Sequence, residues 1–506
     1  MSAMSTEVEL KLRFPPARLR ELLASPALAT PRGSRTRNLV ATYYDTPALD
    51  LWRRRTTLRI RREGGQWVQT VKGEGMVQAG THRRLEIETV LKSGRPDVSV
   101  LPRHAVTRFL RSPAVAAALI PVMRTDISRK LLLIEPASGV LVEAAVDSGT
   151  IRAGRRRERV CELELELKSG PVSALYDIAR QISARVPLAL EHRSKAERGY
   201  ELYGAALNAP LKAAPVSLAG NMTSGAAFQA IVAEALHQVH ANEHGVAVSA
   251  DPEYLHQMRV GIRRLRSALA LFAPLLDAAA DAQSAMLREL GARLGPARDW
   301  DVFIAETLPA VCARWPNDEL PAAFRRSCLE HQARARAKSK KSIKTDSYDK
   351  SMVGLAVWVS DQFQAPGPPR RPLREFAARV LGERHARVLK RGRHLERLTA
   401  AELHRLRIAV KQMRYAVEFF AGLFPARRMA GLRARLSMLQ DILGRMNDAS
   451  VVSKLMAEVT AQSKNRTVAV AAGRIAGWYA ALADQHREAL KPAWRRLCAQ
   501  RATWRT

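Results

Sequence analysis

Charged and apolar residues alternate in the segment EVELKLRF, residues 7–14. In a β-strand this spacing places Glu7, Glu9 and Lys11 on one face and the apolar side chains on the other. Carboxylates can hold Mg²⁺ or Mn²⁺, whereas ammonium and guanidinium groups bind phosphate oxygens. The segment is therefore either an exposed strand with a solvated face or one wall of an ionic site.

The same sorting of acids and bases recurs in later strand-like segments. Arg59 and Arg61 share a face in TTLRIRR, and acids occupy every second position in HRRLEIET and CELELELK. A single strand of this kind would ordinarily turn its charges to solvent. Several of them are better accommodated by a closed barrel whose apolar face packs outward against helices and whose ionic face lines the interior.

Such an interior would contain both parts of a metal-assisted phosphate site. Its carboxylates would hold Mg²⁺ or Mn²⁺, and its cations would neutralise the charge on a transferred phosphoryl group. The sequence has no GxxxxGK loop and no nucleophile-elbow serine. We therefore expect water, rather than a protein side chain, to attack phosphorus.

The hydrophobic period divides the chain into two regions. Segments with period two predominate up to about residue 205, and long helical segments with period 3.6 follow a stretch rich in Ala, Pro, Gly and Ser. We predict an α+β protein with an antiparallel β domain over residues 1–205, a linker over 206–222 and an all-α domain over 223–506.

The helical region repeats itself. LHQMRVGIRRLR in the first half matches LHRLRIAVKQMR in the second, and His256 aligns with His404. A second pair of blocks follows in the same order. We therefore predict two related helical bundles, over about residues 223–360 and 370–506.

Each repeat carries a basic stripe with the spacing i, i+3, i+7 and i+10, which places its members on one helical face. The two stripes are His256, Arg259, Arg263 and Arg266, and His404, Arg407, Lys411 and Arg414. A solvated basic face would explain one stripe, but the duplication favours phosphate binding. Asp299 and Asp448, aligned in the second pair of blocks, are expected to cap helices or to pair with these cations.

The net charge predicts a polyanionic partner. The chain has 82 Lys and Arg against 48 Asp and Glu, a formal charge of +34. Genome composition offers a second explanation for part of this excess. Aromatic residues make up only 6% of the chain, too few to suggest a surface for stacking bases, so we expect a phosphate-rich ligand rather than nucleic acid.

Other features of the sequence narrow the class of protein. The four cysteines contain no CxxC pair, which argues against a zinc or redox motif. The stretch MSAMSTEVEL lacks the basic segment and apolar core that are typical of a signal peptide, and no apolar run is long enough to span a membrane. We expect a cytoplasmic protein, which could associate with polyphosphate granules through its basic stripes. Its oligomeric state is open.

Residues 5 to about 205 resemble the CYTH family, the triphosphate tunnel metalloenzymes. The motifs that carry the resemblance are EVELKLRF, YYDT, LRIRR, the Lys of WVQTVKG, RRLEIE, Val146 with Asp147, ELELEL and SKAERGY. The resemblance implies an eight-stranded antiparallel barrel, the triphosphate tunnel, with flanking helices. It also implies metal-dependent hydrolysis or cyclisation of a triphosphate compound.

The resemblance assigns roles residue by residue. It implies metal ligation by Glu7, Glu9, Asp147, Glu162 and Glu164. It implies phosphate binding by Lys11, Arg59, Arg61, Lys72, Arg84, Arg124, Arg129 and Lys195. It implies catalytic roles for Lys11, Arg59, Arg61, Lys72, Glu86 and Glu88.

Two of these assignments have alternatives. RTDISRK offers both Arg124 and Arg129 for a position on the ionic face, so the strand register is open. Glu86 and Glu88 could bind a second metal ion or position water, or they could only form ion pairs with Arg59 and Arg61.

Residues from about 223 to 500 resemble the CHAD domain, a helical module that binds inorganic polyphosphate through basic surfaces. The combination is similar to bacterial CYTH–CHAD inorganic triphosphatases. It implies inorganic tripolyphosphate as the substrate and long-chain polyphosphate as a ligand of the helical domain. The alternatives are an adenylate cyclase or a thiamine triphosphatase built on the same barrel, or a non-catalytic protein that binds polyphosphate granules.

Overall fold

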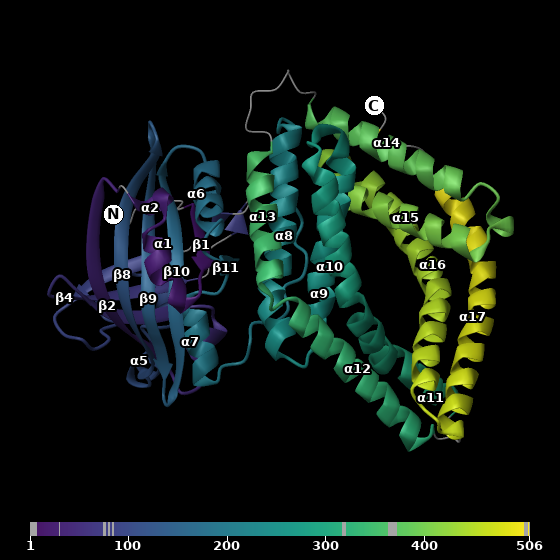
Figure 1. Cartoon of the computed structure of the whole chain (residues 1–506), viewed down its shortest axis with the longest axis horizontal. Helices are drawn as coiled ribbons and strands as arrows, with labels where there is room; N and C mark the ends of the chain where they lie inside the picture. The colour runs from purple at the N-terminus through teal and green to yellow at the C-terminus, as the bar shows by residue number, and fades with distance from the viewer. Residues whose placement is uncertain are drawn as a thin grey trace. The chain divides into compact units, whose positions relative to one another are not determined.

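The computed structural model of the chain forms two compact units (Figure 1). The β unit contains residues 1–209 and 345–364, and the helical unit contains residues 210–344 and 365–506. The structure describes residues 8–29, 31–73, 77–78, 81–82, 85–315, 320–362, 372–499 and 504. No described helix has both the length and the apolar composition needed to cross a lipid bilayer.

The β unit is built on one antiparallel sheet with the strand order β11-β1-β10-β9-β8-β2-β3-β4-β7. Its strands are β1 (Glu9–Arg13), β2 (Gly33–Asp45), β3 (Thr57–Glu63), β4 (Gln66–Gly73), β7 (Leu85–Leu91), β8 (Ile120–Ala137), β9 (Val140–Ala153), β10 (Arg156–Ser169) and β11 (Ala189–Leu190). Strands β5 (Val77–Gln78) and β6 (Thr81–His82) pair in a separate two-stranded antiparallel sheet.

The antiparallel sheet was predicted correctly, but the closed eight-stranded barrel was wrong. The sheet has nine strands, and within the described part of the chain no ladder joins the edge strands β7 and β11. Alternation of residue types determines which side chains share a face of a strand. It does not determine strand number, twist or the pairing of edges, and these decide closure.

Short helices flank the sheet, and the main apolar core lies between some of them and one sheet face. They are α1 (Leu19–Leu23), α2 (Pro26–Ala29), α3 (Asp50–Arg53), α4 (Ala105–Arg108), α5 (Pro113–Ala117), α6 (Ser173–Ser183), α7 (Lys195–Tyr203) and α13 (Asp346–Asp361). Leu163 and Leu165 of β10 pack there with Leu175 and Ile178 of α6. Because successive side chains alternate, the charged residues of β10 lie on the opposite face.

Helix α13 packs with the β unit, although the sequence placed it in the helical domain. Val353 and Val357 are 4% and 6% exposed and belong to the core beneath the sheet. Asp349 accepts hydrogen bonds of 3.4 Å from Arg13 of β1. The sequence shows that this segment is helical, but periodicity does not reveal which surface an apolar helix face covers.

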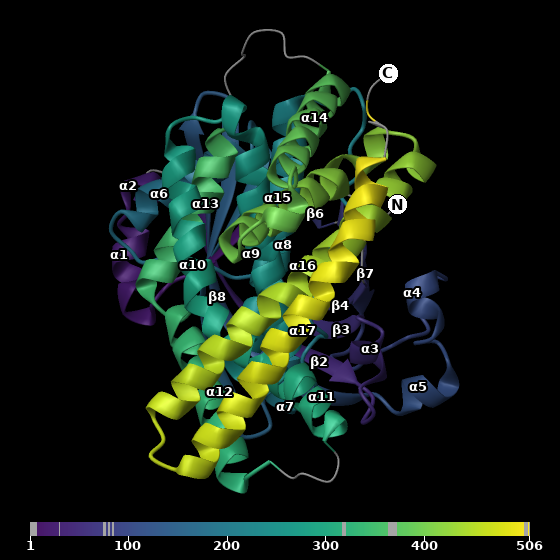
Figure 2. The ribbon, with the colours of Figure 1, turned by 90° about the vertical axis from the view of Figure 1, so that its right-hand side faces the viewer.

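The helical unit consists of long helices packed in pairs. They are α8 (Ser224–Val248), α9 (Pro252–Phe272), α10 (Ala279–Val302), α11 (Leu308–Arg314), α12 (Ala322–Ser342), α14 (Leu373–Arg391), α15 (Ala400–Phe420), α16 (Ala426–Ala461) and α17 (Arg466–Cys498). Helix α8 packs on α9, and α14 packs on α15. Figures 1 and 2 show α16 and α17 side by side along their length.

The internal repeat of the sequence has a counterpart in local structure. Helices α9 and α15, which carry the two basic stripes, are both followed by a short 3₁₀ turn, Ala273–Leu275 and Ala421–Leu423 respectively. In each half a long helix, α10 or α16, comes next. The matching sequences therefore form matching helix–turn–helix segments.

The packing of α13 predicts that the β unit depends on it for stability. Replacing both Val353 and Val357 by Ala should lower the free energy of unfolding of this unit by about 3–5 kcal/mol, because buried methyl groups are lost and cavities remain. Hydrogen exchange of β10 and α6 amides measures the change. The exposed Ser347→Ala variant of the same helix is the control. Unchanged exchange in the double variant would contradict this role of α13.

Candidate metal centre and phosphate sites

Three carboxylates converge on the ionic face of the β unit. Asp147 of β9 lies directly opposite Glu162 of β10, and Glu164 follows two residues later on the same face. One oxygen from each lies within 4.8 Å of the others, the one such group found in the described part of the chain. The Asp147 and Glu162 side chains are 0% and 1% exposed.

The donors of this carboxylate triad fit a hard divalent cation. Carboxylate oxygens are the ligands that Mg²⁺ and Mn²⁺ prefer. Opposite oxygens on Mg²⁺ are about 4.2 Å apart, so small side-chain rotations would bring the triad within coordination distance. Three of the five predicted metal ligands thus lie together.

Lys195 supplies the ammonium group at the centre of the triad. Its Nζ atom lies 2.9 Å from Asp147, 2.5 Å from Glu162 and 3.0 Å from Glu164. It begins helix α7, whose N-cap, Ser194, is fixed by a capping box. The start of the helix therefore sets the position from which this side chain reaches the carboxylates.

Two more predicted cations contact the triad. Arg129 of β8 donates hydrogen bonds of 2.7 and 2.6 Å to Asp147 and one of 2.6 Å to Glu164. Lys11 of β1 lies 3.2 Å from Glu164. Cations from the first strand, from the middle of the sheet and from helix α7 therefore meet at one place.

Arg198 is a member of this cluster that the sequence analysis missed. It is 4% exposed, forms an ion pair with Glu162 and donates 2.7 Å to Glu158 and 2.9 Å to the Arg159 carbonyl. The signal was present in SKAERGY, because Lys195 and Arg198 are three residues apart and share a helical face.

A second set of charged residues lies on β3, β4 and β7. Lys72 is paired with Glu86 across the strands, with 2.8 Å between their charged atoms. Arg59 lies 3.4 Å from Glu86, and Arg61 lies 3.5 Å from Glu88. The structure thus shows Glu86 and Glu88 in the ion pairs that were one alternative for them.

The triad and this second set share one face of the sheet. Arg129 and Thr125 point to the same side of β8, because they are four residues apart on an uninterrupted ladder. Thr125 lies opposite Ala41, and Ala41 lies opposite Arg61. The triad and the second charged set therefore lie on the same face of the sheet, separated by buried uncharged residues such as Thr125 and Ala41.

The remaining predicted residues lie elsewhere. Arg124 is exposed and five residues from Arg129 on the same regular ladder, so it lies on the opposite face, and the open register is resolved in favour of Arg129. Glu9 is 49% exposed and contacts Lys11 at 3.8 Å rather than joining the triad. Glu7 and Arg84 are outside the described residues.

Mutual neutralisation fixes the charge states around the triad. Burial alone would lower the pKa of the Lys195 ammonium, but the carboxylates outweigh it and raise that pKa above its ordinary value. The pKa of Lys11 is raised in the same way, against burial, first by Glu164. Burial would raise the pKa of Glu164, but Lys195, Lys11 and Arg129 hold it well below its usual range.

In the helical unit, the two basic stripes approach one another. Helix α9 packs against α15, and Arg263 of α9 donates a 3.4 Å hydrogen bond to the Tyr415 hydroxyl of α15. The charge of Arg263 also lowers the pKa values of Arg407 and Lys411, although burial is the larger cause for both. The stripes therefore form one positive region.

Few acids balance the charge of this positive region, and burial and mutual repulsion lower the pKa values of several of its members. Burial, followed by neighbouring arginines, lowers the pKa of Lys411 to about 7, of Arg259 to about 10 and of His256 to about 4. The buried Nε atoms of Arg259, Arg407 and Arg414 have no hydrogen-bond partner in the described structure. A buried charged group without a hydrogen-bond partner destabilises the folded protein unless an anion binds to it.

The ends of the stripes differ between the halves. Asn447 accepts hydrogen bonds of 3.2 Å from His404 and from Arg407. In the first half Arg298 takes the place of Asn447, and its charge is the largest influence after burial on the pKa of His256. Arg266, at the far end, has its pKa lowered by burial and then by Arg288.

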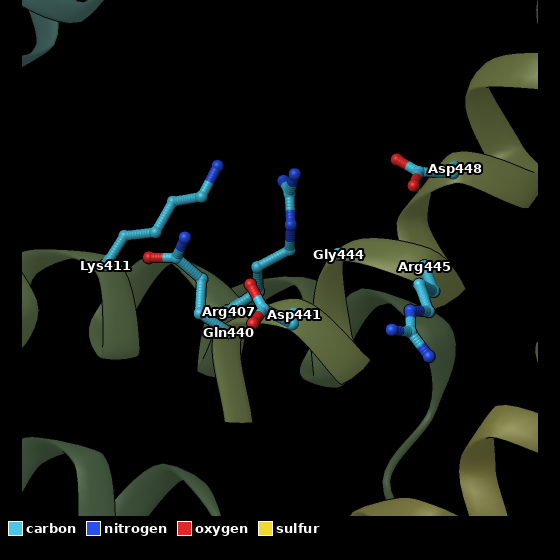
Figure 3. Close-up of a pocket in the computed structure, with 7 residues that line it drawn as sticks. All are labelled: Arg407, Lys411, Gln440, Asp441, Gly444, Arg445 and Asp448. Carbon is cyan, nitrogen blue, oxygen red and sulfur yellow. The ribbon is translucent and has the colours of Figure 1, made fainter. Parts of the chain in front are cut away.

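A pocket of about 360 Å³ opens between α15 and α16 (Figure 3). It is lined by Arg407, Lys411, Gln440, Asp441, Gly444, Arg445 and Asp448. In Figure 3 the Arg407 and Lys411 side chains extend in the same direction from α15. Asp448 and its repeat counterpart Asp299 lie inside helices rather than capping them, each near a stripe arginine.

Comparison with known proteins identifies both parts of the chain. Residues 5–200 match the CYTH domain and residues 230–457 match the CHAD domain. The chain therefore carries a CYTH domain followed by a CHAD domain.

Two relatives illustrate the match. The chain is 33% identical over 199 residues to a Haemophilus influenzae protein named inorganic triphosphatase, covering 39% of this chain and 55% of the relative. The chain thus spans little more than half of that protein. A crystal structure of the CHAD domain from the plant Ricinus communis is 33% identical, with a TM-score of 0.52, and covers 58% of this chain and 98% of the plant chain.

Proposed function

We propose that the β unit hydrolyses inorganic tripolyphosphate with Mg²⁺ or Mn²⁺ and that the helical unit binds long-chain polyphosphate. The observation that supports the first part is the carboxylate triad on the same sheet face as the cations of β3 and β4. The likeness of residues 5–200 to a protein named inorganic triphosphatase supports the choice of substrate.

In this proposal the carboxylates of the triad bind the metal ion, and the arginines on the same sheet face bind the substrate. Asp147, Glu162 and Glu164 would hold the metal ion, which when bound would neutralise phosphate oxygens and make water more acidic. Arg59 and Arg61 would bind phosphate oxygens of tripolyphosphate and hold the substrate in line for attack by water. Water attacks the terminal phosphorus, the bridging P–O bond breaks, and pyrophosphate and orthophosphate leave.

In the second charged set, Arg59 is suited to binding phosphate and Glu86 is suited to orienting the attacking water. The buried Nε of Arg59 has no hydrogen-bond partner in the described structure, so it can donate to a phosphate oxygen. Burial would raise the pKa of Glu86, but Lys72 and then Arg59 outweigh it, so Glu86 remains ionised. An ionised carboxylate beside bound phosphate can orient the attacking water.

Adenylate cyclase activity would require a surface for adenine. Trp52 is stacked on Tyr200 with 4.7 Å between ring centroids and is packed into an apolar cluster. Trp67 has the guanidinium of Arg62 over its ring at 5.9 Å. Both tryptophans near the sheet are thus engaged, which favours an inorganic substrate.

The proposal predicts that activity depends on the triad. Glu164→Gln should reduce phosphate release from tripolyphosphate with Mg²⁺ or Mn²⁺ by at least about a hundredfold, because one anionic ligand is lost. Glu21→Gln, a change on α1 at a partly exposed residue that pairs with Arg18, should leave the rate unchanged. Release of pyrophosphate from ATP in a parallel assay would reveal a cyclase instead. Equal rates for Glu164→Gln and wild type would exclude this site.

For the helical unit, we propose that polyphosphate binds to the positive region of α9 and α15 and balances its charge. The unpartnered guanidinium nitrogens and the lowered pKa values both indicate charge that the protein itself does not balance. A flexible polyanion could follow the stripes of both repeats at once. Such binding would bring a cytoplasmic enzyme to stored polyphosphate.

Binding of polyphosphate should be accompanied by proton uptake. In the free protein the pKa of Lys411 is about 7, against an ordinary value of 10.5, so at pH 8 the group is mostly neutral. A bound polyanion raises this pKa, and the affinity should therefore fall as pH rises above 7. Calorimetry at pH 8 in two buffers with different ionisation enthalpies measures the uptake.

The uptake should disappear in Lys411→Met and persist in Lys464→Met, which changes an exposed lysine between α16 and α17. Uptake of equal size in both variants would show that another group titrates. Absence of polyphosphate binding by wild-type protein would refute the role proposed for the helical unit.

A further inference from the structure

Lys195 occupies the position within the triad that a metal ion would take. Its ammonium nitrogen is within 3.0 Å of one oxygen of each carboxylate, and its side chain is only 15% exposed. One lysine thus contacts an oxygen of each of the three carboxylates that form the candidate metal site. An ammonium group and a divalent cation cannot occupy such a small space together, because their charges repel strongly.

The two arginines beside the triad are held more rigidly than Lys195. Arg129 donates a bidentate pair of hydrogen bonds to Asp147 and a further hydrogen bond to Glu164. Arg198 is fixed from the other side by Glu158 and the Arg159 carbonyl. A planar guanidinium with several fixed bonds moves less easily than a single ammonium on a flexible stem. Lys195 is more easily moved than either arginine, and unlike Lys11, which lies beside Glu164, it contacts all three carboxylates, so it is the cation that a metal ion would displace.

The start of α7 lets this side chain move without moving the backbone. Ser194 accepts a 3.2 Å hydrogen bond from the Glu197 amide, and Glu197 accepts one of 2.6 Å from the Ser194 amide. This capping box anchors the first turn of the helix. Rotation about the four side-chain bonds of Lys195 can then carry its ammonium group out of the triad.

We propose that Lys195 is a built-in counter-ion of the triad, which a divalent cation displaces on binding. Without the metal, its charge prevents mutual repulsion of the three carboxylates. Once displaced, the ammonium group is free to bind a phosphate oxygen of the substrate. This second step rests on the function proposed above, whereas the competition between lysine and metal does not.

The competition is tested by metal binding alone. Full-length protein is freed of metal with a chelator and titrated with Mn²⁺, and free Mn²⁺ is measured by electron paramagnetic resonance. Lys195→Met keeps the length of the side chain and removes its charge, so it should bind Mn²⁺ at least about tenfold more tightly than wild type. Equal or weaker binding by this variant would overturn the proposal.

Lys130→Met is the matched control. Lys130 follows Arg129 on β8 and therefore points to the opposite face of the sheet. Lys130→Met removes one positive charge, as Lys195→Met does, but leaves Lys195 between the three carboxylates. Its Mn²⁺ affinity should stay within about twofold of wild type. A gain in Lys130→Met equal to that in Lys195→Met would attribute the effect to net charge and contradict the proposal.

If Lys195→Met is less stable than wild type, thermal unfolding with and without Mn²⁺ provides a second measure of metal binding. Lys195→Met should unfold at a lower temperature than wild type in chelator, because the three carboxylates, two of them buried, repel one another. It should also gain more stability than wild type from Mn²⁺. Equal gains would contradict the competition. Wild-type protein that binds Mn²⁺ without hydrolysing tripolyphosphate would refute the proposed function and leave this proposal to be judged by the Mn²⁺ affinities.

Discussion

The structure of the β unit depends on holding three carboxylates within 4.8 Å of one another on adjacent strands. Like charges at this distance are unfavourable, so they require cations, and the chain supplies these from β1, β8 and α7. Strand β1 and helix α7 are thus tied to the middle of the sheet by charge. The apolar face of the same strands packs against helices and fixes the strand positions.

The two units treat positive charge in opposite ways. Around the triad each cation has a carboxylate partner, and ion pairing raises the pKa values of Lys11 and Lys195. On α9 and α15 arginines and lysines lie beside one another with few acids, and the pKa values of Arg259 and Lys411 are lowered. The first arrangement suits a site that assembles a metal and a short substrate, and the second suits capture of a long polyanion.

Much of this organisation could be predicted from the sequence. The alternation in EVELKLRF and CELELELK indicates which side chains share a face, and the ladders place Lys11 beside Glu164 as that pattern requires. The 3.6-residue period of the helical region and the duplicated stripe predict α9 and α15. These features are local, because each follows from the backbone geometry of one element.

The errors and omissions concern contacts between distant segments. The register that separates Arg129 from Arg124 depends on the pairing of β8 with β9, which neither strand encodes alone. The membership of Arg198 in the cluster depends on where α7 docks, and the place of α13 in the β unit depends on an apolar surface far away in sequence. Closure of the sheet likewise depends on how its edges meet.

The location of the metal ion tests the central claim most directly. Crystals grown with Mn²⁺ and a non-hydrolysable triphosphate analogue can be measured at the manganese absorption edge, where anomalous differences locate the ion. We expect a peak coordinated by Asp147, Glu162 and Glu164, with the Lys195 ammonium displaced toward a phosphate oxygen. Manganese bound elsewhere in the β unit, with Lys195 still between the three carboxylates, would contradict this claim.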